Sequence, residues 1–204
     1  MTMTVTTEKP RIFRSTAALV GGWAWMVFAG LNFIDLAIRG RDMASLVATA
    51  VLLTTCGIAY VAGIRPRVAA SADAVRVRNP FRDAELPWKS VRTVDAAEAL
   101  RLHYTTEDGA EKILRVWSLP NSPRAQARAE RRSRKEAAEL PEHVAKAVAG
   151  KTHVTYAIEQ LTEMAAKYGK SGPSGGAVRW SAPAVLALAV PALFLVITIV
   201  IAGT

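Results

Sequence analysis

Three long apolar runs constrain this chain more than any other feature of its sequence. They cover residues 16–38, 43–64 and 182–202, and each is long enough to cross a bilayer, which takes about 20 residues of helix. Inside a bilayer the backbone N–H and C=O groups must be paired within the protein, and a helix satisfies this requirement by itself. The sequence therefore predicts three transmembrane helices, two in an N-terminal hairpin and one near the C-terminus.

The first run has a competing interpretation as a secretory signal peptide, because Lys9, Arg11 and Arg14 precede it. Its length, its central Trp23 and Trp25, and the second apolar run that follows almost at once favour a membrane helix instead. We therefore expect the hairpin to stay in the mature protein.

The basic residues beside the runs predict their orientation. Those on one side are Lys9, Arg11 and Arg14 before the first run, Arg65 and Arg67 after the second, and Arg179 before the third. The loop between the first two runs holds Arg39 and Arg41, partly offset by Asp42. Because Lys and Arg are enriched in cytoplasmic flanks, we expect a multi-pass protein of the cell membrane. Its N-terminus and residues 65–179 face the cytoplasm, and Thr204 lies outside.

Composition limits the chemistry that the chain can carry. The formal charge of +9 accompanies 51% hydrophobic residues, which indicates a membrane protein with a basic soluble part rather than a soluble nucleic-acid binder. The single cysteine, Cys56, excludes an intramolecular disulfide, and it lies beside Thr54 and Thr55 as expected for helix packing. The three histidines are dispersed and lack the spacing of a zinc site. We expect no metal, no cofactor and no enzymatic activity.

Residues 65–120 form the one long stretch whose pattern predicts β-structure. Apolar and polar residues alternate at 75–78 and at 100–104, which is typical of strands with one buried face. Turn signals follow at Asn79-Pro80 and at residues 107–109, the latter between two runs that predict a β-hairpin.

The same stretch contains an ordered set of short motifs, namely Arg65-Pro66-Arg67-Val68, Val75-Arg76-Val77-Arg78-Asn79-Pro80-Phe81-Arg82, Pro87-Trp88 with Val91, and Val116-Trp117-Ser118-Leu119-Pro120. Together they resemble the bacterial PH-like domain, and more narrowly its membrane-anchored actinobacterial branch named low-molecular-weight protein antigen 6. The resemblance implies a small, strongly bent antiparallel sheet closed by a C-terminal helix. It implies no agreed activity, because PH-type scaffolds host lipid-headgroup binding, peptide binding and assembly.

Two helices are predicted between this sheet and the third apolar run. Residues 123–140 are rich in good helix formers and carry the basic side chains Arg124, Arg128, Arg131, Arg132, Arg134 and Lys135. Residues 152–168 place one apolar seam on a second helix, through Val154, Ile158, Leu161, Ala165 and Tyr168. The basic helix is either a solvated surface or a contact with anionic lipids, whereas the amphipathic helix must pack against the sheet.

The predicted class is therefore a membrane α+β protein, with a cytoplasmic PH-like sheet capped by a helix. Its segments are a tail at 1–15, the hairpin at 16–64, the PH-like β domain at 65–120, two helices at 121–168, a flexible linker at 169–179 and the third span at 180–204.

Three functions stay open at the level of the sequence. The first is a membrane-tethered adaptor for other membrane or envelope proteins, with Trp88 and Trp117 either in the core or lining a partner groove. The second is a sensor of anionic lipid headgroups through the basic helix. The third is a transport or membrane-enzyme subunit that depends on Asp35, which lies one turn from Asn32 and four residues before Arg39. A salt bridge with Arg39 is the simpler interpretation of Asp35.

Overall fold

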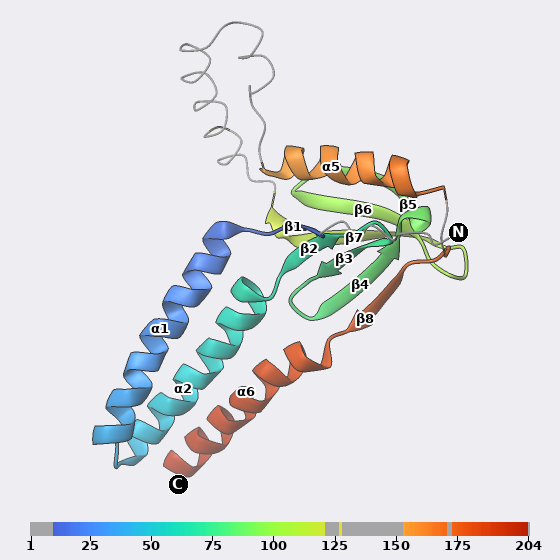
Figure 1. Cartoon of the computed structure of the whole chain (residues 1–204). Coiled ribbons are helices and arrows are strands. Elements are labelled where there is room, and N and C mark those ends of the chain that lie inside the picture. The colour runs from blue at the N-terminus through green and yellow to red at the C-terminus, as the bar shows by residue number, and fades with distance from the viewer. Residues whose placement is uncertain (1–9, 121–126, 128–152, 171–172, 204) are drawn as a thin grey trace, which may run out of the picture. The chain divides into compact units, whose positions relative to one another are not determined.

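The computed structural model describes residues 10–120, 127, 153–170 and 173–203, and Figure 1 shows their helices and strands. The chain divides into two compact units. The first comprises Met1–Phe13, Val68–Val77 and Ala84–Val178, and the second comprises Arg14–Arg67, Arg78–Asp83 and Arg179–Thr204. Each unit is described by itself below.

The first unit is built on two antiparallel sheets. One has the order β1-β2-β3-β4-β8, from β1 (Arg11–Phe13), β2 (Arg67–Ala70), β3 (Ala74–Arg78), β4 (Arg82–Pro87) and β8 (Ala177–Trp180). The other has the order β5-β6-β7, from β5 (Val91–Ala96), β6 (Ala99–Thr105) and β7 (Glu111–Pro120). The predicted hairpin is confirmed, because Thr105 pairs with Glu111 across the turn. Gly109 takes a positive φ of 82° in that turn, a conformation that glycine adopts without steric cost.

The core of this unit lies on the inward faces of both sheets. The alternation noted in the sequence decides which side chains are buried, as in β6, where Leu100, Leu102 and Tyr104 are buried. Helix α5 (His153–Tyr168) packs against this core. Its buried residues are Val154, Ala157, Leu161 and Met164, while Ile158, Ala165 and Tyr168 of the predicted seam are partly buried. The apolar stripe of α5 is thus wider than a single seam.

Two short strands lie where the sequence predicted a tail and a linker. Residues 11–13 pair with β2 as β1, and residues 177–180 form β8 at the other end of the same sheet. Each has only three or four residues, too few to give a clear period-2 pattern. Their place in the sheet comes from backbone pairing with strands distant in sequence, which local patterns do not reveal.

The second unit contains α1 (Thr16–Arg39), α2 (Met43–Ala59) and α6 (Ala182–Ala202). The helix of α2 continues through a π-helical turn at Tyr60–Ile64. With that turn included, the three helices have 24, 22 and 21 residues and are long and apolar enough to cross a membrane. Their boundaries follow local capping, since the side chains of Ser15 and Asp42 accept hydrogen bonds from the first turns of α1 and α2.

Small residues set how closely these helices pack. A Cβ added at Gly57 would collide with the backbone carbonyl oxygen of Ala187 in α6. A Cβ at Gly63 would lie 2.9 Å from the carbonyl oxygen of Ala18 in α1. Glycine at positions 57 and 63 therefore allows α2 and the π-helical turn to approach α6 and α1 at backbone distance.

Candidate functional site

The outer face of the β5-β6-β7 sheet presents polar and apolar side chains side by side. In the antiparallel register, Asp95 lies opposite Arg101 and His103 lies opposite Ile113. Arg101 and His103 alternate along β6 with the buried Leu100, Leu102 and Tyr104, so they and the residues opposite them point away from the core.

Asp95 is the centre of a polar cluster on this face. Its carboxylate accepts a hydrogen bond from Arg101 Nε at 2.6 Å, and its second oxygen lies 2.8 Å from His103 Nε2. The hydrogen bond from Arg101 is the main cause that lowers the pKa of Asp95, and the contact with His103 lowers it further. The charge of Asp95 is thus largely satisfied within the sheet.

Strand β7 adds two exposed apolar side chains to the same face. Trp117 is 58% exposed, and Ile113, four residues before it, is exposed as well. Arg115 lies between them and pairs with Glu98 at 2.5 Å. In the described part of the chain, β7 forms one end of its sheet and pairs with β6. An extended peptide can add to an exposed sheet edge as a further strand.

The two tryptophans of the predicted partner groove do not lie on one surface. Trp88 is 1% exposed and belongs to the core of the first unit. Its indole Nε1 donates a hydrogen bond to the carbonyl oxygen of Ser71 at 2.8 Å, so its polar group is satisfied. Only Trp117 of this pair is accessible to a partner.

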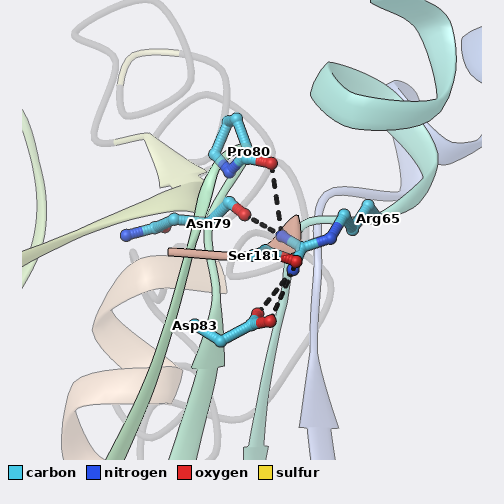
Figure 2. Close-up of polar contacts among 5 residues, drawn as sticks. All are labelled: Arg65, Asn79, Pro80, Asp83 and Ser181. Atoms are coloured by element: carbon cyan, nitrogen blue, oxygen red, sulfur yellow. Dashed lines mark hydrogen bonds and ion pairs between the residues drawn. The ribbon is translucent and has the colours of Figure 1, made fainter. Parts of the chain in front are cut away.

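A second cluster, which we term the arginine clamp, consists of Arg65, Asn79, Pro80, Asp83 and Ser181 (Figure 2). The Nη2 atom of Arg65 lies 2.6 and 2.7 Å from the two carboxylate oxygens of Asp83, and 2.6 Å from Ser181 Oγ. Its Nη1 atom donates to the carbonyl oxygens of Asn79 and Pro80. Figure 2 shows these groups converging on one guanidinium, whose two terminal nitrogens both donate to them.

The π-helical turn places Arg65 for this role. The backbone N–H of Arg65 donates to the carbonyl oxygen of Tyr60, five residues earlier, at 2.9 Å. This wider turn changes the direction in which the following side chain leaves the helix. The clamp therefore joins the residue after the π-helical turn, the β3–β4 turn and the residue before α6 within the second unit.

The central part of the chain is similar to a known domain family. Residues 65–136 match the bacterial PH domain family. This match confirms the PH-like expectation, while the narrower resemblance to the antigen 6 branch stays a prediction. The chain has no match among the curated proteins or the solved structures that were compared.

A PH-like domain suggests a module that binds proteins or lipids, and such domains generally have no catalytic activity. Among the described residues, no group of three or more His, Cys, Asp or Glu side chains is arranged to hold a metal ion.

The remaining predicted sites have simpler surroundings or lie outside the described residues. Asp35 forms the predicted pair with Arg39, at 3.2 Å between Oδ1 and Nε, and both side chains are exposed. Asn32 donates to the carbonyl oxygen of Phe28 in its own helix. Six basic residues of the predicted helix at 123–140 lie outside the described residues: Arg124, Arg128, Arg131, Arg132, Arg134 and Lys135.

Proposed function

We propose that this protein is a membrane-tethered adaptor, with its PH-like domain on the cytoplasmic face binding other membrane or envelope proteins. The observation that carries the proposal is the combination in one chain of a PH-like domain and three helices long enough to span a bilayer. Such helices confine the domain to the membrane surface, where its binding partners would be confined too. Confinement raises the effective concentration of both, so a modest affinity is sufficient.

Charge distribution supports the cytoplasmic placement. Arg14 precedes α1, Arg65 and Arg67 follow the second span, and Arg179 precedes α6. The opposite ends of α1 and α2 meet at Arg39, Arg41 and Asp42, and Arg39 is already paired with Asp35. The side with the larger excess of arginine is expected to face the cytoplasm.

The partner that fits the outer face of the β5-β6-β7 sheet is an extended cytoplasmic segment of another membrane protein. Such a segment would add to β7 by backbone hydrogen bonds and place apolar side chains against Ile113 and Trp117. Trp117 would contribute most of the affinity, because exposed aromatic residues that become buried dominate interface energetics.

Site-specific photocrosslinking in intact cells tests this proposal. A crosslinker at position 117 should capture a membrane protein through one extended segment, whereas a crosslinker at Glu85, exposed on the other sheet, should not. A synthetic peptide of the captured segment should then bind the purified full chain, and Trp117→Ala should weaken this binding by at least about tenfold. Equal capture from both positions, or peptide binding insensitive to Trp117→Ala, would overturn the assignment of this surface.

The transport alternative rests on Asp35 in α1. Its carboxylate is exposed and already paired with Arg39 in the same helix, an arrangement expected at the end of a span. We therefore favour the adaptor over the transport alternative. The proposed lipid contact of the basic helix falls on residues outside the described ranges.

A further inference from the structure

The second unit has a marked excess of positive charge around one end of its helices. The residues beside the start of α1, the end of the second span, the β3–β4 turn and the start of α6 include six arginines and a single acid. These are Arg14, Arg65, Arg67, Arg78, Arg82 and Arg179, against Asp83. Because Asp83 is paired with Arg65 in the arginine clamp, the other five charges have no acidic counterpart in the described part of this unit.

Trp180 marks the point at which the third apolar helix begins. It is 68% exposed and lies two residues before the first residue of α6. The guanidinium carbon of Arg82 lies 5.0 Å from the centre of its ring, within range of a cation–π interaction. Tryptophan is enriched where transmembrane helices leave the hydrocarbon and enter the headgroup region. The Arg82–Trp180 pair therefore has the composition of a headgroup-level contact.

The backbone around this pair is held in place by bonds within the second unit. The N–H of Ser181 donates to the carbonyl oxygen of Phe81 at 2.9 Å, which joins the β3–β4 turn to the start of α6. The N–H of Asn79 closes the turn on the carbonyl oxygen of Arg82 at 2.8 Å. Arg78 and Arg82 flank this turn and are exposed, as is Arg179. The arginine clamp holds the same turn from Arg65, so a ligand would not have to order these strand ends.

We propose that Arg78, Arg82 and Arg179, together with Trp180, bind the headgroups of anionic phospholipids in the leaflet from which α6 starts. Guanidinium groups donate paired hydrogen bonds to phosphate oxygens, and anionic leaflets attract each basic residue close to the surface. The surface selects lipids by negative charge, since its cationic groups are spread over a turn and a strand end. This inference rests on the membrane placement given under the proposed function, and it assigns the lipid contact to residues other than the basic ones at 123–140.

Lipid selection can be measured on the full chain reconstituted into nanodiscs of phosphatidylcholine and phosphatidylglycerol in equal amounts. Native mass spectrometry of the released protein counts the lipids of each kind that stay bound. We expect phosphatidylglycerol to be enriched, and Arg82→Gln with Arg179→Gln to reduce this preference by about 10- to 30-fold. The control variant, Arg39→Gln with Arg41→Gln, removes the same amount of charge at the other ends of the helices. It should leave the preference for phosphatidylglycerol unchanged.

Further variants and a quenching measurement distinguish a loss of lipid binding from a folding defect. Arg82→Lys with Arg179→Lys keeps the charge and should retain most of the enrichment, which guards against a general folding defect in the glutamine variant. Phosphatidylglycerol brominated in its acyl chains should quench the tryptophan fluorescence of the full chain more than that of its Trp180→Phe variant. Lack of enrichment, or an equal loss in the Arg39 and Arg41 variant, would overturn the lipid site while leaving insertion intact. A wild-type chain that fails to enter the nanodiscs would overturn the membrane placement itself.

Discussion

Asp83→Ala tests the arginine clamp directly, because the two members of its ion pair differ greatly in exposure. The side chain of Arg65 is 6% exposed and that of Asp83 is 43% exposed. Among the described residues, removal of the carboxylate leaves the buried guanidinium with the carbonyl oxygens of Asn79 and Pro80 and the hydroxyl of Ser181 as partners. A buried cation without its counter-charge is costly.

The free energy of unfolding lost in Asp83→Ala lies between two limits. Loss of one partner from a fully buried ion pair costs about 3–5 kcal/mol, and loss of one from an exposed pair costs less than about 1 kcal/mol. Water reaches Asp83 but hardly reaches Arg65, so we expect about 2–3 kcal/mol for Asp83→Ala. For a chain of this size, that free energy corresponds to a fall of about 4–12 °C in melting temperature.

Glu85→Ala is the matched control, since Glu85 lies on the same strand β4 and forms an ion pair with Arg76 at 2.8 Å. Both of these side chains are more than half exposed, and we expect a loss of less than about 1 kcal/mol. The assay is thermal unfolding of the full chain in nanodiscs, followed by circular dichroism. Equal shifts for the two variants would refute the argument that burial of Arg65 decides the cost.

Three further predictions concern placement, core and pH. A reporter active only in the cytoplasm should work when inserted at Gly172 and fail when fused after Thr204; a silent reporter at Gly172 would contradict the proposed topology. Leu102→Ala should lower the free energy of unfolding by about 2–5 kcal/mol because Leu102 is fully buried, whereas His103→Ala, on the outer face, should cost much less in the same thermal assay. The pKa of Asp95 lies below its ordinary value of 3.8, so its carboxylate stabilises the folded state above about pH 4, and this contribution is lost as the pH falls through the lowered pKa. In Asp95→Asn, the melting temperature should therefore fall less steeply as the pH is lowered below about 4. An unchanged fall would rule out a stabilising role of the Asp95 carboxylate.

The sequence predicted those elements whose pattern is local. Alternation at residues 100–104 gave the buried side of β6 because a strand with one buried face repeats every two residues. The three apolar helices were equally clear, since length and composition alone define them. The same alternation places Trp117 between the buried Val116 and Ser118, so its exposure could have been inferred.

The arginine clamp could not be predicted in this way. The sequence marks Arg65 only as a basic residue beside an apolar run, because its partners lie 14 to 18 and 116 residues away along the chain. Its direction also depends on the π-helical turn at Tyr60–Ile64, for which the apolar sequence gives no signal. Core packing of Trp88, one of the two roles considered from the sequence, is confirmed, although Trp88 follows a proline and lies in a short 3₁₀ turn rather than in a strand.

The distance of 116 residues between Arg65 and Ser181 has a consequence for biosynthesis. A chain made from the N-terminus exposes the hairpin and seven of its strands long before β8 and Ser181 leave the ribosome. Until then β4 lacks its neighbour β8, and the guanidinium of Arg65 lacks the hydroxyl that it later binds. Chains truncated before residue 177 should accordingly be preferred substrates of membrane proteases, because β4 then lacks β8 and Arg65 lacks the hydroxyl of Ser181.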